Sequence, residues 1–304
     1  MERRSFLGRL EISNKLYLAI VWIVVVFVFF MTFYPLYYVF IYSINDPAAV
    51  QPGLMWIPRQ LTFQAYRRIL ENPVVRSAFM ISTARAVIGP ITSLFITMLI
   101  AFPLSIRPLP GRRFFNFYFV ITMYVSAGLI PGFLLIHNLG LTDTFAVYIL
   151  PGLVNVFGMI LIRTYMEGLP DSLRESAQID GAGYFRIFFI IIAPLCLPVM
   201  AAITLFGAVG QWNAFQDVFL FNIRSEHLYT LQFVLARMVQ GLRVSDAAAA
   251  DALAQQITAE GGSLVTPRTM RLAITVFTIV PITLVYPFLQ RYFVKGLMIG
   301  SVKG

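Results

Sequence analysis

Apolar residues along the chain gather into long stretches separated by short polar segments. The first stretch, residues 16–45, runs for 30 positions without a charged side chain. About 20 apolar residues are enough for a helix to cross the hydrocarbon core of a bilayer. This stretch is also longer than the apolar core of a signal peptide. We therefore expect a transmembrane helix over residues 16–42.

Five further stretches have the length of membrane spans. A polar loop with four prolines, residues 46–73, prevents a second continuous span directly after the first. In the third span Pro131 and Gly132 should bend or end the helix. In the fifth, two prolines should interrupt the backbone hydrogen-bond ladder. The expected spans are 76–106, 114–136, 144–162, 187–210 and 272–290. The predicted fold class is thus all-α, a polytopic membrane protein with six transmembrane helices.

Composition agrees with this pattern and excludes several other classes. Hydrophobic residues make up 59% of the chain and charged residues 12%, against about a quarter charged in soluble domains. The net charge of +9 comes from dispersed arginines, so nucleic-acid binding is not indicated. The single cysteine, Cys196, reads as a core residue. Phosphate-binding loops, hydrolase motifs and metal-ligand spacings are absent from the sequence, so we expect no catalytic residue, cofactor or metal on this chain.

The distribution of basic residues predicts the orientation. If the N-terminus lies inside the cell, the inner segments hold 13 arginines and lysines and the outer segments hold 7. Because cytoplasmic loops are enriched in these residues, both termini should be cytoplasmic, including a lead over residues 1–15 and a tail over 295–304. The longest outer loop, 211–267, should contain two short helices. Leu228–Gln240 would lie on the membrane surface or against a neighbouring span, and Ser245–Glu260 would follow it.

One polar segment, residues 163–198, interrupts the apolar stretches. It contains several residues that typically start or end a helix, so it is unlike a linker without structure of its own. Ser172 and Glu175 have the spacing of a capping box, which predicts a helix starting near Ser172. Gly181 can adopt the left-handed conformation that ends a helix, and Gly183 is a second position at which the backbone is conformationally free. On these signals alone, Glu175 would merely cap the helix.

Part of this interruption resembles the E-A-A-x3-G-x9-I-x-L-P loop of bacterial ABC importer permeases. The match is carried by residues at the fixed spacings of that loop: Glu175-Ser176-Ala177, Gly181 and, after nine intervening residues, Ile191-Ile192-Ala193-Pro194. Two positions differ, since Ser176 replaces an alanine and Ala193 replaces a leucine. Both replacements are small, so a close-packed contact is retained.

Two further segments are similar to the carbohydrate-uptake, or maltose-type, branch of that family. One is Asp180-Gly181-Ala182 with the second proline, Pro198. The other is the C-terminal tail, in which residues 298–304 are closest to permeases for oligosaccharides of acidic or complex polysaccharides such as alginate. The resemblance covers most of the chain. It implies the type I importer permease fold, with a permease domain over residues 16–294.

The resemblance also implies partners and a docking site. In this family the loop is the coupling helix, which docks into a groove on a separate ATPase subunit and so links ATP hydrolysis to alternating access. Residues 167–186 would form this loop, with six docking residues: Glu175, Ser176, Ala177, Asp180, Gly181 and Ala182. The implied partners are a second homologous permease, two ATPase subunits that hold ATP and Mg²⁺, an extracytoplasmic solute-binding protein and a carbohydrate. The implied location is the bacterial cytoplasmic (inner) membrane.

Three residues are candidates for the substrate path. Arg85 lies well inside a predicted span, where an arginine costs about 2.5 to 3.5 kcal/mol to insert. It should face the protein interior or water and could meet an acidic or hydroxyl-rich substrate; alternatively it lies near the outer interface and pairs with a carbonyl. Trp212-Asn213 resembles a W-N pair of carbohydrate permeases, although aromatic residues at this depth also serve as interface anchors.

Other functions remain as alternatives. An importer of the same family for a non-sugar solute would share all of these features. A stand-alone secondary transporter should carry acidic residues within its spans, and the spans delimited above contain none. A membrane-embedded enzyme would need converging His, Asp, Glu or Cys side chains there, which the spans largely lack.

Overall fold

The regular structure of the described residues is almost entirely helical. A computed structural model describes residues 2–46, 56–240 and 267–301. Within these ranges the regular elements are helices, apart from one isolated antiparallel bridge between Asn45 and Leu61. The all-α fold class is therefore confirmed. The chain divides into two compact units, Met1–Ile69 with Asp251–Phe277 and Leu70–Ala250 with Thr278–Gly304.

Candidate membrane spans occur both as continuous and as broken helices. Three helices are long and apolar enough by themselves, over Tyr17–Ser43, Pro73–Ser105 and Arg268–Pro287. Three more pairs of helices qualify if each bent pair counts as one span. The described residues thus contain three to six candidate spans, which identifies a multi-pass membrane protein.

The first unit is built on α1, Glu2–Ser43, and part of α2, Gln64–Glu71. Most apolar side chains of the α1 span are exposed, as expected for a helix that meets lipid or another membrane protein. At its end, the backbone N–H of Asp46 donates to the Gln60 carbonyl (2.9 Å), and that of Thr62 donates to the Ile44 carbonyl (2.9 Å). Helix α2 lies within the loop that was expected over residues 46–73. The four prolines of that loop had excluded a continuous membrane span but gave no sign of this short helix.

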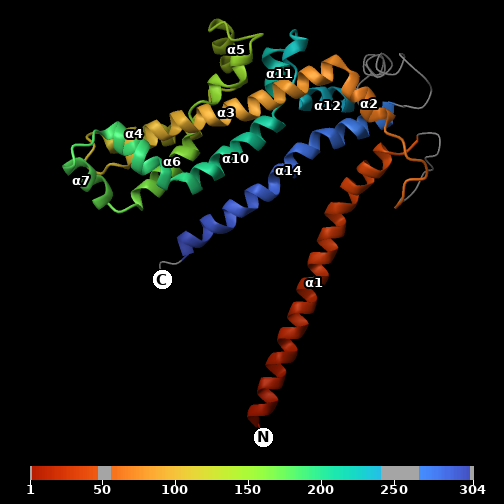
Figure 1. Cartoon of the computed structure of the whole chain (residues 1–304), viewed down its shortest axis with the longest axis horizontal. Coiled ribbons are helices and arrows are strands. Elements are labelled where there is room, and N and C mark those ends of the chain that lie inside the picture. The colour runs from red at the N-terminus through yellow and green to blue at the C-terminus, as the bar shows by residue number, and fades with distance from the viewer. Residues whose placement is uncertain (1, 47–55, 241–266, 302–304) are drawn as a thin grey trace. The chain divides into compact units, whose positions relative to one another are not determined.

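The second unit is organised around α3, Pro73–Ser105, α6, Val156–Glu167, and α10, Leu197–Asn213, which lie side by side (Figure 1). Close approach of α3 and α10 depends on glycine. A Cβ atom on Gly207 would stand 3.2 Å from the Pro90 ring, and one on Gly89 would stand 3.1 Å from the Gln211 side chain. The expected second span, 76–106, matches α3 closely.

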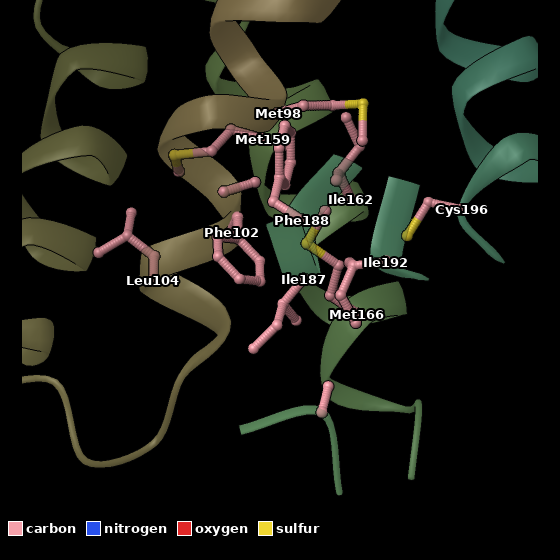
Figure 2. Close-up of a cluster of buried hydrophobic side chains, with 12 residues drawn as sticks. Met98, Phe102, Leu104, Met159, Ile162, Met166, Ile187, Phe188, Ile192 and Cys196 are labelled. Atoms are coloured by element: carbon pink, nitrogen blue, oxygen red, sulfur yellow. The ribbon is translucent and has the colours of Figure 1, made fainter. Parts of the chain in front are cut away.

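A compact apolar core joins these helices at one end (Figure 2). Phe102 of α3 meets Phe188 with ring centroids 5.2 Å apart. Cys196 is fully buried in the same cluster, which confirms its expected place in the core. Around them pack mainly aliphatic side chains: Met98, Leu104, Met159, Ile162, Met166, Ile187 and Ile192.

The third expected span is broken at a different place from the one predicted. Helix α4, Arg112–Tyr124, and helix α5, Leu129–Asn138, meet at 111°. The chain leaves α4 at the extended residue Val125 and enters α5 through Gly128, whose φ is +88°. Pro131 lies in the first turn of α5, where its missing N–H is not needed. The bend therefore precedes Pro131 and Gly132, which was not expected.

The fourth and fifth spans are also bent. Phe145–Gly152, formed by the short 3₁₀ helices η2 (Phe145–Tyr148) and η3 (Leu150–Gly152), meets α6 at 46°. The fifth begins with α8, Tyr184–Arg186, continues as a π-helix, η4, Ile187–Ile192, and includes α9, Ala193–Leu195. It turns by 78° before α10, at Cys196. The expected interruption is present, and both prolines lie in first turns of the helices that flank it.

Short helices follow α10, and a long one ends the described chain. These are α11, Gln216–Phe221, the 3₁₀ helix η5, Glu226–Leu228, α12, Leu231–Gln240, and α14, Pro267–Ser301. Leu231 and Phe233 of α12 are fully buried, and α12 packs against α3. Of the two expectations for this segment, packing against a neighbouring span is correct. The helix expected over 245–260 lies outside the described residues. The sixth span starts earlier than the expected residue 272.

Candidate functional site

The first candidate site is the short helix α7, Ser172–Ile179, between α6 and α8. It begins at the predicted residue and ends as predicted. Gly181 has a φ of +79°, and just beyond it the N–H of Ala182 donates to the Ala177 carbonyl (2.9 Å). This left-handed ending satisfies carbonyls that the last turn would otherwise leave open.

The capping box that the sequence suggested does not form. Asp171 is the N-cap residue, its side chain makes no capping hydrogen bond, and Ser172 is already inside the helix. The hydroxyl of Ser172 is therefore not positioned to cap the helix. The carboxylate of Asp171 instead pairs with Arg174. Glu175 is left exposed rather than folded back onto the helix start.

The six docking candidates differ in burial: most lie on the exposed face of the α7 segment, and one packs into the core. Glu175, Ser176, Asp180 and Gly181 are exposed, whereas Ala182 is half-buried. Ala177 is buried and belongs to the apolar core of Figure 2. Ile179, which sequence reasoning did not single out, is 86% exposed. It adds one apolar side chain to the exposed face of α7.

Beside α7 lies a cleft of about 340 Å³. Phe102, Ile106 and Arg107 line one side, at the end of α3, and Asp171, Arg174, Glu175 and Gln178 line the other.

An ion-pair cluster lies near the same end of the unit. Glu167 pairs with Arg112 and, at 3.4 Å, with Arg163, and the Arg112 Nε donates to the Leu104 carbonyl (2.8 Å). The ends of α3, α4 and α6 are thereby tied together just before α7 starts.

The second candidate site surrounds Arg85 of α3. Its side chain is 2% exposed, so it lies in the protein interior, and its Nη1 atom also donates to the Ala214 carbonyl (3.3 Å), the kind of partner that the alternative expectation named. The Nη1 atom donates to Asp217 Oδ1 (3.2 Å) and Nη2 to Asp217 Oδ2 (2.5 Å). The Nε atom donates to Gln211 Oε1 (2.9 Å), and the guanidinium carbon lies 4.4 Å from the centre of the Tyr148 ring.

These partners come from elements that the sequence alone does not bring together. Asp217 belongs to α11 and Tyr148 to η2, and their distances along the chain from Arg85 exceed 60 residues. Asp217 is in the outer stretch after the expected fifth span, so it was not counted as a membrane charge. Its signal in the sequence was an isolated acid a few residues after Trp212-Asn213. A buried arginine requires such a counter-charge.

Trp212 and Asn213 occupy different environments. The Trp212 ring is 7% exposed, meets Phe79 edge-on and donates its indole N–H to the Thr278 carbonyl (3.1 Å). Asn213 is exposed and accepts a hydrogen bond from Gln232 (3.0 Å). Trp212 is thus a packed residue in this conformation, while Asn213 faces an open cavity of about 530 Å³. Whether either residue meets substrate stays a prediction.

A cavity of about 500 Å³ adjoins Arg85. Most of its wall is apolar or glycine, from α3, α10, α11, the two 3₁₀ helices and the residues just before α6. The polar groups on the wall are Arg85, Ser93, Tyr148, Asn155, Gln211 and Asp217. A mainly apolar cavity with a few fixed polar groups is typical of a small-molecule site. Among the described residues, no group of His, Cys, Asp and Glu side chains could hold a metal ion.

Comparison with known proteins extends across nearly the whole chain. No family model matches it. The polygalacturonan/rhamnogalacturonan transport system permease protein of Bacillus subtilis is 37% identical over 257 residues, covering 84% of this chain and 86% of that protein. The arabinooligosaccharides transport system permease protein of Halalkalibacterium halodurans is 32% identical, covering 70% of this chain and 69% of that protein.

A solved structure agrees with these relatives. A chain of a bacterial ABC transporter involved in the import of the acidic polysaccharide alginate matches with a TM-score of 0.82 and 31% identity, over 92% of this chain and 98% of that one. The helical fold agrees with this match. The chain therefore belongs to the permease subunits of bacterial carbohydrate ABC importers.

Proposed function

We propose that this chain is one of two permease subunits of an ATP-driven oligosaccharide importer in the bacterial cytoplasmic membrane. Six spans would cross the bilayer, each bent pair counting as one, with both termini in the cytoplasm. The excess of basic residues on the inner segments supports this orientation. It places α7 on the cytoplasmic side, where an ATPase subunit can reach it. The domain limits expected from the sequence, 1–15, 16–294 and 295–304, are retained.

The observation that carries this proposal is the division of α7 into an exposed face and a buried anchor. Glu175, Asp180 and Ile179 offer charge and apolar surface to a partner, while Ala177 fixes the helix to the core that contains Phe102 and Phe188. Because protein interiors are close-packed, a displacement of α7 must be transmitted to the helices around that core. ATP and Mg²⁺ would bind to the ATPase pair, whose closure would move α7 and reorient the spans.

The remaining partners follow from membership of the family. A second permease would complete the translocation path, and an extracytoplasmic binding protein would deliver the sugar. Arg85, Trp212 and Asn213 remain candidates for the path of the substrate. The relatives named above transport oligosaccharides or polysaccharides, so we infer a carbohydrate substrate for this chain. A permease for a non-sugar solute, or less readily a stand-alone transporter, is the alternative.

Copurification tests the assembly. The chain is tagged in its native cell, the membranes are solubilised gently, and the recovered proteins are identified. We expect an ATPase and a second permease in the same complex, and ATP-dependent uptake of an oligosaccharide by that complex in vesicles. Recovery of this chain alone from several detergents would reject the proposed assembly and favour a self-sufficient transporter.

A further inference from the structure

The cavity beside Arg85 contains a carboxylate-binding group that already holds a carboxylate. Two guanidinium nitrogens of Arg85 meet the two carboxylate oxygens of Asp217, at 3.2 Å and 2.5 Å. This two-pronged arrangement is the geometry in which arginine recognises carboxylates generally. Gln211 fixes the third nitrogen, Nε, at 2.9 Å and is itself held by the Tyr148 carbonyl, to which its Nε2 donates at 3.2 Å.

The two members of this ion pair are unequally buried. The Arg85 side chain is 2% exposed, and that of Asp217 is 23% exposed. Asp217 also lines a second cavity, of about 530 Å³, together with Asn213 and Gln216. The arginine is therefore fixed among its neighbours, whereas the aspartate has an open side toward which its carboxylate can turn.

Burial of Arg85 restricts what can replace Asp217. A guanidinium that loses its counter-charge inside a protein is unfavourable, so a neutral sugar group competes poorly with Asp217 for Arg85. A second carboxylate can take the place of Asp217, because it restores both the charge balance and the two hydrogen bonds. Among the described residues that line the cavity near Arg85, no other side chain is basic. A carboxylate that enters this cavity thus has one position to occupy.

We propose that Arg85 is a specificity-determining residue for acidic oligosaccharides, with Asp217 as its resident ligand. The carboxylate of a uronate sugar displaces the Asp217 carboxylate from Arg85, and Asp217 turns toward the second cavity. The apolar and glycine wall, with Ser93 and Asn155, accommodates the sugar ring. This inference rests on the proposed function, and it adds to that function the chemical class of the substrate and the residue that selects it.

Labelling of a single cysteine in the assembled importer tests the exchange. Ser93→Cys places a thiol on the cavity wall, and the native Cys196 is fully buried. The rate of maleimide labelling of this chain is measured with trigalacturonate and with its neutral methyl ester. The acid should give half-maximal protection at a concentration roughly tenfold lower than the ester, which corresponds to one hydrogen bond to a charged group.

Variants separate the ion pair from general effects of sequence change. The double variant Arg85→Gln/Asp217→Asn removes both charges without leaving either unpaired, and both sugars should then protect at similar concentrations. Asp217→Asn alone should increase the preference for the acid, because Arg85 has lost its resident carboxylate. The control, Arg112→Gln/Arg163→Gln/Glu167→Gln, removes the whole ion-pair cluster outside the cavity and should keep the wild-type preference.

Three outcomes would overturn the inference. These are equal protection by acid and ester in the wild type, no protection by millimolar acid, and an acid preference that survives the double variant. Recovery of the assembled importer precedes the labelling, so a failure of the proposed function is recognised at that earlier step. An intact importer without acid preference rejects the role of Arg85 alone.

Discussion

Gly181 is the residue at which backbone geometry and docking can be tested separately. Its φ of +79° favours glycine, but a Cβ atom added there would meet nothing within 4 Å. Asp and Asn tolerate this conformation better than other residues, so either costs only about 1 kcal/mol of stability. Gly181→Asp should insert normally but abolish coupled uptake, because it adds a negative charge to the face proposed to meet the ATPase. Oligosaccharide uptake and ATPase copurification measure the effect.

Gly181→Asn is the matched control for that variant. It has the same shape and the same backbone cost as the aspartate but carries no charge, so it should retain most of the uptake. Wild-type uptake by Gly181→Asp would contradict the docking role. Loss of uptake in both variants would instead assign the defect to the backbone of the helix end.

Individual residues also show how far the sequence could predict the candidate sites. The left-handed Gly181 follows from a local signal, since a helix end depends on neighbours within a few positions. The start of α7 was placed at the right residue, but from a capping box that does not form. The buried position of Arg85 was one of two that the cost of a charge in a membrane span allowed. The partners of Arg85 did not follow from the sequence, because Asp217 and Tyr148 meet it only through the packing of helices that are distant in sequence. The failed capping box depended on a shift of one residue, which spacing alone does not resolve.

At the scale of elements, the contact of α3 with α10 depends on a glycine that faces a rigid ring. Gly207→Leu would place a branched side chain against Pro90, where even a Cβ atom stands at only 3.2 Å. Overpacking of this kind costs about 1 to 3 kcal/mol. We expect a lower midpoint of thermal unfolding in detergent. Gly210→Leu, three residues along the same helix, is the control, because a Cβ atom there meets nothing within 4 Å. An equal loss in both variants would contradict the packing role of Gly207.

The helical elements were largely predictable, and their breaks were not. Long apolar runs determine where α1, α3 and α14 lie, because a span needs only length and hydrophobicity. The turn before α5 depends on Gly128, which is one glycine among 20 in the chain. The π-helix Ile187–Ile192 has no signature in an unbroken apolar run, although π-helical turns occur frequently at functional sites. The short helix α2 was not predicted, because the prolines of its segment were used only to exclude a continuous membrane span.

At the scale of the whole molecule, orientation determines whether the coupling helix can meet its partner. The distribution of arginine and lysine predicts that α7 lies in the cytoplasm and the segment around Glu226 outside. The chain suits a cysteine-accessibility test, since its single cysteine is fully buried and both Asp180 and Glu226 are exposed. A membrane-impermeant maleimide should label Glu226→Cys in spheroplasts, whose outer wall barrier is removed. It should label Asp180→Cys only after the membrane is opened.

The unmodified chain, with Cys196 alone, gives the background. Labelling of Asp180→Cys in sealed spheroplasts would put α7 on the outer face, where no ATP-driven subunit could act on it, and both the orientation and the coupling mechanism would then be wrong.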